Sequence, residues 1–186
     1  MTDSKISSLL VDINNRLEEG KGPDKANLAV FLQEIKEVME NFFEEDVNRD
    51  NKGKLRLSAV GKEDRKLWYD YHGYDKEPLG TDTRIKFCFG NLLEAFVLLL
   101  VKEAGHKVTE CQKEVTVGQV KGHIDCLIDG ELVDVKSASP YGFKKFKDGS
   151  ILKGDDPFGY MYQLSSYGKA LKKKIGYFLS IDKSGG

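Results

Sequence analysis

The fold is decided by the stretch Gly122-His-Ile-Asp-Cys-Leu-Ile-Asp-Gly-Glu-Leu-Val-Asp-Val-Lys136. Asp129-Gly130 interrupts alternating apolar residues, and this dipeptide is the strongest short-range signal for a two-residue β-hairpin turn. In the register that such a turn imposes, Asp125 lies directly opposite Asp134, with the two Cβ atoms about 4.5–5.5 Å apart. The residues that alternate with these aspartates are also apolar, so we expect a sheet that is buried on both faces.

Two carboxylates side by side in a dry site must share either a proton or a cation. Mg²⁺ and Mn²⁺ prefer oxygen ligands, and a carboxylate pair suits them. Lys136 projects from the same face as Asp134 because side chains alternate along a strand. Two interpretations stay open: a metal-binding catalytic cluster, or a buried Asp–Lys–Asp ion network that only holds the structure together.

Helices and further strands are predicted on both sides of this hairpin. From residue 83 onward the pattern indicates the order α-β-β-β-α-β, which predicts an α/β fold with a mixed sheet flanked by helices. The expected elements are a long apolar helix over residues 83–104, strands over 106–117, 120–128 and 131–136, a short helix over 140–146, a helix over 156–173 and a strand over 175–181.

The first 50 residues are predicted to form a separate part of the chain. Apolar stripes predict helices over residues 6–19 and 24–45, which we expect to pack as a helical hairpin. Residues 46–53 are polar and rich in turn formers, so they are the candidate boundary. We therefore assign 1–50 to an acidic helical appendage and 51–186 to the main domain.

Charge is unevenly distributed, although the formal net charge of the chain is −1. Residues 1–50 carry a net charge of −6, and residues 136–186 carry +6. Such asymmetry indicates either a solvated lysine-rich surface or a polyanionic partner. The sequence shows no signal peptide and no apolar run long enough to span a bilayer, so we expect a cytoplasmic protein without membrane association.

Glu94 is the only acidic residue within the apolar stretch 87–101. A lone carboxylate in such surroundings needs a partner, or its pKa rises. If the helix packs on the sheet, Glu94 can join Asp125 and Asp134. The alternative is that Glu94 lies on the solvent edge of the helix.

An ordered set of motifs resembles the PD-(D/E)XK nuclease superfamily, in its RecB-type and lambda-exonuclease-type branch. Its core signature, an acid on one strand and acid-x-Lys on the next, is similar to the segment from Gly122 to Lys136. Gly90-Asn-Leu-Leu-Glu94 resembles the acid on the preceding helix, and Gln163-Leu-Ser-Ser-Tyr167 resembles the Gln-x-x-x-Tyr motif. The resemblance covers about residues 54–181, including an upstream segment over 57–69, and implies a restriction-endonuclease-like core with a nuclease domain over 51–186.

The resemblance implies a metal-dependent deoxyribonuclease. Asp125, Asp134 and the backbone carbonyl of Val135 would ligate Mg²⁺ or Mn²⁺, and Glu94 would complete this site or supply a second one. Lys136 would position or help to activate the attacking water and stabilise the transition state. Some relatives bind an iron–sulfur cluster, but the three cysteines here lack the spacing for one, so we expect none.

Several residues are candidates for contacts with DNA. Gln163 and Tyr167, one helical turn apart, would orient the site and contact the DNA backbone, or would form a core tyrosine with a surface glutamine. Arg56, Ser58 and Arg65 are candidates for a phosphate pocket, or are ordinary surface residues. Lys144 and Lys145 belong to a basic cluster that could line a DNA groove and make binding depend on salt.

The leading functional interpretation is an exonuclease of DNA recombination or processing, with a phage as a candidate source. A structure-specific or restriction-like endonuclease is the alternative with the same chemistry. A DNA-binding protein with a decayed nuclease site is a third possibility, which the intact Asp125, Asp134 and Lys136 disfavour. Some relatives form rings, but the sequence leaves the oligomeric state undetermined.

Overall fold

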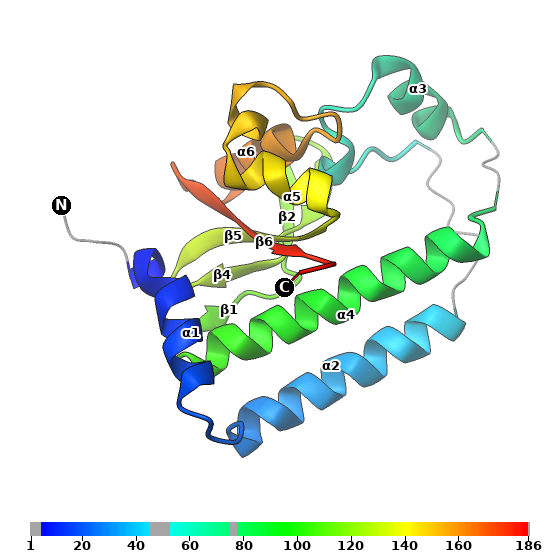
Figure 1. The fold of residues 1–186 in the computed structure, drawn as a ribbon. Helices are drawn as coiled ribbons and strands as arrows, with labels where there is room; N and C mark the ends of the chain where they lie inside the picture. The colour runs from blue at the N-terminus through cyan, green and yellow to red at the C-terminus, as the bar shows by residue number, and fades with distance from the viewer. Residues whose placement is uncertain (1–4, 45–52, 75–77, 186) are drawn as a thin grey trace. The chain divides into compact units, whose positions relative to one another are not determined.

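The computed structural model describes residues 5–44, 53–74 and 78–185 (Figure 1). The chain divides into two compact units. The first unit comprises Met1–Asp46, Leu79–Thr109 and Leu127–Gly130, and the second comprises Val47–Pro78, Glu110–Cys126 and Glu131–Gly186. The predicted boundary over residues 46–53 falls largely outside the described ranges, so the division into 1–50 and 51–186 stays a prediction.

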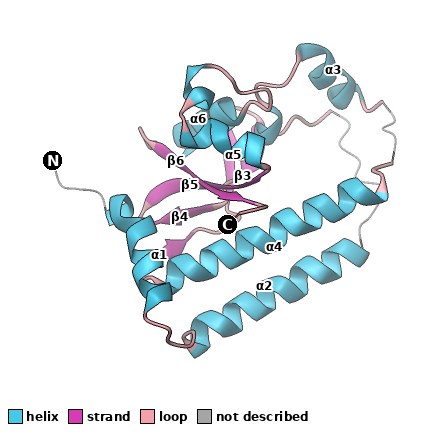
Figure 2. Cartoon of the chain, in the orientation of Figure 1, coloured by secondary structure: helices cyan, strands magenta, loops and turns pink. Residues whose placement is uncertain are grey.

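The secondary structure confirms an α/β protein with a mixed sheet (Figure 2). One four-stranded sheet has the order β1 (Val108–Thr109), β4 (Cys126–Ile128), β5 (Glu131–Ala138) and β6 (Gly176–Asp182). β1 and β4 are antiparallel, whereas β5 and β6 are parallel. A separate antiparallel hairpin is formed by β2 (Glu114–Val117) and β3 (Val120–His123). No helix in the described part of the chain has the length and apolarity to cross a membrane.

Among its described residues, the first unit holds the α-helices α1 (Leu9–Glu18), α2 (Lys25–Phe43) and α4 (Thr81–Glu103), with a 3₁₀ turn η1 (Lys5–Ser8) before them. Asp24 is the N-cap of α2, since its Oδ1 accepts hydrogen bonds from the backbone N–H groups of Ala26 at 2.8 Å and Asn27 at 3.1 Å. The helix starts that the sequence predicts are therefore close to those observed.

The packing of these helices differs from the predicted helical hairpin. α2 lies along α4 rather than along α1, as Figure 1 shows. Phe31 of α2 meets Phe96 of α4 edge to face, with ring centroids 6.5 Å apart. The reason is the apolar character of α4, which offers α2 a longer apolar surface than the ten-residue helix α1 does.

The second unit holds the helices α3 (Asp64–His72), α5 (Pro140–Lys147) and α6 (Tyr160–Leu171), and the 3₁₀ turns η2 (Leu57–Ala59) and η3 (Ser150–Lys153). α6 begins at Tyr160, later than the predicted start at residue 156. The carboxylate of Asp156 accepts hydrogen bonds from the backbone N–H groups of Tyr160 at 3.0 Å and Met161 at 2.8 Å. Asp156 therefore satisfies the free N–H groups of the first turn without being part of the helix.

Two predicted strands are each divided in the structure. The expected strand over 106–117 becomes β1 and β2, because Glu110 and Gln112 take positive φ angles of 56° and 52° that end the extended conformation. The expected strand over 120–128 becomes β3 and β4, with Ile124 and Asp125 between them. The interruption matters because it places Asp125 between two strands rather than inside one.

The core of the second unit forms where α6 and η2 pack against the β2–β3 hairpin. Leu57, Leu132, Leu164 and Tyr167 are buried there. Gly122 of β3 permits this contact: a Cβ atom at this position would lie 2.7 Å from Leu57 Cβ and 3.0 Å from Tyr167 Cε1. Any larger residue at position 122 would push η2 or α6 away from the strand.

Candidate functional site

Asp125 and Asp134 come together at the start of β4 and in the middle of β5. Asp129 and Gly130 both have positive φ angles, 50° and 84°, as a two-residue type I′ turn requires. Asp125 Oδ2 accepts a hydrogen bond of 2.7 Å from the backbone N–H of Val135, next to Asp134. The turn and this hydrogen bond hold the two carboxylates in the neighbourhood that the sequence predicts.

Lys136 completes the cluster. Its Nζ lies 2.5 Å from Asp134 Oδ2, and the two side chains are only 17% and 2% exposed. The same Nζ lies 5.1 Å from the ring centroid of Tyr160, on α6. The ammonium therefore sits between a buried carboxylate and an aromatic face, both of which stabilise its positive charge.

Asp134 has an unusual feature for so buried a carboxylate. Neither Oδ1 nor Oδ2 has a hydrogen-bond partner among the described residues. The ammonium of Lys136 pairs with Oδ2, whereas no donor among the described residues approaches Oδ1. A buried carboxylate normally fills its lone-pair positions with donors, so this one keeps vacant acceptor positions.

The electrostatics of the cluster follow from its burial. Burial, and to a lesser extent the charge of Asp125, raise the pKa of Asp134 to about 6, although Lys136 opposes both. Burial also raises the pKa of Asp125, against the opposing effects of Lys136 and the Val135 N–H. For Lys136, burial lowers the pKa, but the charges of Asp134 and Asp125 outweigh it and the pKa is raised.

These properties fit a divalent cation with hard oxygen ligands. Two carboxylates with raised pKa values, one of which has both oxygens without donors, form a site that a cation would stabilise. The described residues hold no group of three or more His, Cys, Asp or Glu side chains arranged for a metal. The protein would therefore supply two carboxylates here, with further positions left to backbone, water or substrate oxygens.

Gln163 and Tyr167 lie one turn apart on α6, as predicted. Gln163 Nε2 donates a hydrogen bond of 3.1 Å to the hydroxyl of Tyr167, and Tyr167 is only 1% exposed. Burial raises the pKa of Tyr167, and the charges of Asp125 and Asp134 act in the same direction. Tyr167 is thus a core residue whose pKa is affected by the charges of the carboxylate pair, and Gln163 fixes the position of its hydroxyl through the hydrogen bond.

The predicted phosphate-pocket residues separate into two places. Arg56 and Ser58 line a cavity of about 810 Å³ together with Lys54, Gln163 and Tyr167. Arg65 does not line it; this residue lies on α3, with its guanidinium 5.7 Å from the ring centroid of Tyr69. The structure therefore joins Arg56 and Ser58, but not Arg65, to the Gln163–Tyr167 pair.

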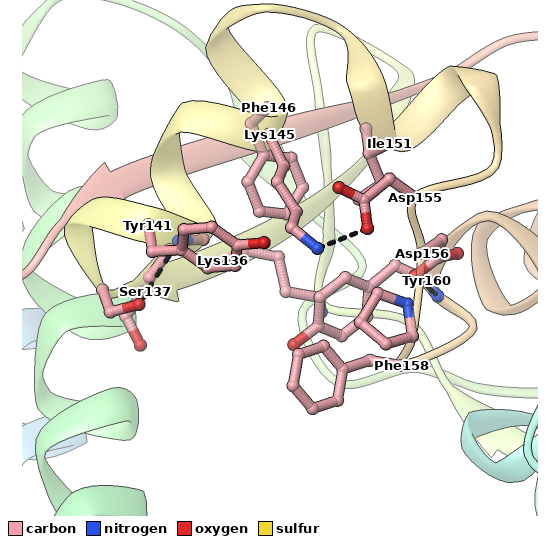
Figure 3. Close-up of a pocket in the computed structure, with 14 residues that line it drawn as sticks. Lys136, Ser137, Tyr141, Lys145, Phe146, Ile151, Asp155, Asp156, Phe158 and Tyr160 are labelled. Carbon is pink, nitrogen blue, oxygen red and sulfur yellow. Dashed lines mark hydrogen bonds and ion pairs between the residues drawn. The ribbon is translucent and has the colours of Figure 1, made fainter.

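The predicted basic cluster also divides. Lys145 lines a second cavity, of about 360 Å³, that has Lys136 in its wall (Figure 3). Its Nζ pairs with Asp155 Oδ1 at 2.5 Å and lies 5.0 Å from the ring centroid of Tyr141. Lys144 is exposed and does not line this cavity.

Glu94 belongs to α4 in the first unit, where it is half-buried. Its predicted participation with Asp125 and Asp134 stays a prediction.

Sequence reasoning missed Tyr160, whose ring faces the Lys136 ammonium. The signal was present in the sequence, because Tyr160 precedes Gln163 by three residues and Tyr167 by seven. Residues at this spacing share one face of a helix. A search along that face of α6 would have found it.

Comparisons with protein-family models, with curated proteins and with solved structures gave no match. The site is therefore interpreted from its own geometry and chemistry.

Proposed function

We propose that this protein is a Mg²⁺- or Mn²⁺-dependent DNA nuclease of the PD-(D/E)XK type, with a restriction-endonuclease-like core. The observation that carries the proposal is the buried carboxylate of Asp134 beside Asp125: its Oδ2 is paired with the ammonium of Lys136, and the acceptor positions of its Oδ1 have no donor among the described residues. A purely structural ion network would be expected to fill those positions with donors.

Asp125 and Asp134 would hold the cation, with the backbone carbonyl of Val135 as a further oxygen ligand. When bound, such an ion lowers the pKa of a water molecule and neutralises charge that builds up on a phosphate. Asp125 is already held by the Val135 N–H at 2.7 Å, so its second oxygen is the one that can turn to a ligand.

Lys136 is positively charged when no metal ion is bound. The charges of Asp134 and Asp125 then raise its pKa above the ordinary value despite burial, so its amine is protonated at neutral pH. A protonated amine can donate hydrogen bonds to a water molecule or to a developing negative oxygen, but it cannot accept a proton. Its role in the proposed reaction is therefore to orient water and to stabilise charge.

The DNA strand would run through the 810 Å³ cavity, toward Gln163 and Tyr167. Lys54 and Arg56 bring positive charge to its wall, where Lys121 is paired with Glu114 at 2.7 Å. Contacts of this kind to phosphates supply most of the affinity in sequence-independent binding. We favour an exonuclease acting in DNA recombination or processing, with an endonuclease as the alternative.

The test is cleavage of end-labelled linear duplex DNA with a 5′-phosphate or a 5′-hydroxyl, beside a closed circular duplex, in Mg²⁺ and in EDTA. We expect Mg²⁺-dependent release of labelled products from the linear substrates and an intact circle. Cutting of the circle would assign the same site to an endonuclease. Binding of all substrates without cleavage, in Mg²⁺ and in Mn²⁺, would reject the nuclease and support the DNA-binding protein with a decayed site.

A further inference from the structure

The 360 Å³ cavity beside Lys136 has walls unlike those of a phosphate site. Four aromatic side chains line it: Tyr141 and Phe146 from α5, Phe158 from the turn before α6, and Tyr160, the first residue of α6. Figure 3 shows Tyr141 and Lys136 on one side of the opening, and Tyr160 and Phe158 on the other. The cavity thus has aromatic surfaces on two opposing sides.

The rings at the mouth are exposed although they are large and apolar. Tyr141 is 73% exposed and Phe158 is 64% exposed. Phe158 stacks on Tyr160 with ring centroids 5.4 Å apart and an interplanar angle of 29°. Exposed aromatic surface gathered at the rim of a cavity is typical of a binding site.

The charges that line this cavity cancel. Lys145 is paired with Asp155 at 2.5 Å, and Asp156 accepts two backbone hydrogen bonds from α6. Lys136 is the remaining cation, and it is already paired with Asp134. A phosphate group would gain little here, whereas a flat uncharged ring system would gain stacking and apolar contact.

Lys136 connects this cavity to the candidate active site. Its ammonium forms part of the cavity wall and at the same time contacts Asp134 in the candidate active site. A group bound in the cavity is therefore adjacent to the phosphate that would be cleaved. The volume of about 360 Å³ is near the lower end of small-molecule sites, which suits one planar ring system.

We propose that this cavity binds one unpaired nucleobase of the substrate strand, next to the scissile phosphate; this inference rests on the proposed nuclease function. A base in a duplex is stacked on both sides and cannot enter, so the strand must be opened at this point. Stacking on aromatic side chains holds any base, and the selection is for unpaired ends or distorted DNA rather than for sequence.

The first experiment is abasic interference in the nuclease assay. One abasic nucleotide is moved stepwise through the terminal positions of each strand of a linear duplex, and turnover by the wild-type protein is measured in Mg²⁺. We expect turnover to fall about 10-fold or more at one position, as for the loss of one stacking contact. Equal turnover at every position would overturn the base pocket and leave the nuclease assignment intact.

The second experiment tests whether the base at the sensitive position binds in this cavity. Phe158→Ala and Tyr141→Ala should lower turnover of the intact substrate by a similar factor, about 10-fold. The same variants should cause little further loss on the abasic substrate, because the contact is already missing. Tyr162→Ala is the matched control, since Tyr162 is 63% exposed on α6 but does not line the cavity. If Phe158→Ala and Tyr141→Ala lower turnover of the abasic substrate by the same factor as turnover of the intact substrate, the proposal is overturned.

A binding measurement separates failure of the pocket from failure of the nuclease. Single-stranded oligonucleotides with one 2-aminopurine are added to the protein in EDTA, and quenching of 2-aminopurine fluorescence reports stacking on an aromatic ring. Quenching by the wild type and by Tyr162→Ala, but not by Phe158→Ala, would support the pocket even if no substrate is cleaved. Equal quenching by all three proteins, or by none of them, would overturn it.

Discussion

Asp134 in the second unit and Glu103 in the first are both buried carboxylates that are paired with a basic side chain. Their side chains are 2% and 8% exposed. Glu103 accepts hydrogen bonds from Arg16 at 2.7 Å, from Asn27 Nδ2 at 2.9 Å and from the backbone N–H of Asp24 at 3.0 Å. Asp134 has an ion pair but no hydrogen-bond donor among the described residues.

The pKa values of these two acids move in opposite directions. Burial alone would raise the pKa of Glu103, but the donors Asn27, Asp24 and Arg16 outweigh it and the pKa is lowered. Burial and the charge of Asp125 raise the pKa of Asp134 to about 6, because the single ammonium of Lys136 offsets them only in part. The surroundings of Glu103 are those of a structural carboxylate, which links segments of the first unit through hydrogen bonds. The surroundings of Asp134 are typical of a carboxylate that binds a ligand.

The largest expected difference between these acids is in turnover. Asp134→Asn should lower the rate of Mg²⁺-dependent DNA cleavage about 1,000-fold, because a metal ligand and its charge are lost. Glu103→Gln should keep the wild-type rate, since it removes a charge outside the proposed site. Single-turnover assays at saturating enzyme would measure both. An Asp134→Asn protein with near-normal turnover would contradict the proposed metal site.

The next largest expected effect is a difference in turnover between variants of two lysines, Lys136 and Lys102, that are each paired with an acidic side chain. Lys136→Ala should lower turnover about 100-fold while the protein remains folded. Lys102 is the control, because its side chain is also 17% exposed and its Nζ lies 3.3 Å from Glu34. Lys102→Ala should cleave DNA at the wild-type rate. Circular dichroism of both variants checks folding, and equal rates for the two would remove Lys136 from the mechanism.

Stability should depend on pH with opposite signs at the two acids. The pKa of Asp134 rises from 3.8 to about 6 on folding, so its protonated form favours the folded state. In EDTA, this group makes the free energy of unfolding fall by about 3 kcal/mol as the pH rises from about 4 through 6. Glu103, with a lowered pKa, contributes stability above its unfolded pKa and loses it in acid.

Urea titrations in EDTA from pH 4 to 8 would test these signs. The difference in unfolding free energy between Asp134→Asn and the wild type should grow in favour of the variant as the pH rises. Glu103→Gln should instead be less stable than the wild type at neutral pH, by about 1–3 kcal/mol. A difference between Asp134→Asn and the wild type that does not change with pH would show that Asp134 has an ordinary pKa in the folded protein.

The smallest effect is the stabilisation by metal. At a Mg²⁺ concentration 100 times the dissociation constant, we expect the wild type to gain about 2.7 kcal/mol of unfolding free energy. Glu103→Gln should show the same gain, and Asp134→Asn should show none. Thermal melts with increasing Mg²⁺, and with Ca²⁺ as a second hard cation, would measure the gain. Stabilisation of Asp134→Asn equal to that of the wild type would place the cation elsewhere.

The local features of the site could be predicted from the sequence because they depend on short-range rules. The Asp129-Gly130 dipeptide favours the two positive φ angles that a two-residue turn needs, and this turn brings Asp125 near Asp134. The four-residue spacing of Gln163 and Tyr167 likewise predicts a shared helix face, on which the structure shows a hydrogen bond between them.

The features that the sequence did not predict depend on contacts between distant segments. The packing of α2 along α4 requires a comparison of apolar surfaces far apart in the chain. The aromatic cavity joins Tyr141 to Phe158 and Tyr160 across the turn η3, and no spacing rule connects these segments. The vacancy at Asp134 is a property of everything around it, so a residue pattern alone cannot reveal it.

The length of the two-residue turn at Asp129-Gly130 determines which face of the sheet Asp134 and Lys136 project from. Side chains alternate along a strand, so one inserted residue would turn Asp134 and Lys136 to the opposite face, away from Asp125. Many substitutions in the turn would only weaken the hairpin, whereas a change in its length would separate the acids completely. In this protein the length of one turn is therefore as much a part of the proposed site as the identity of its side chains.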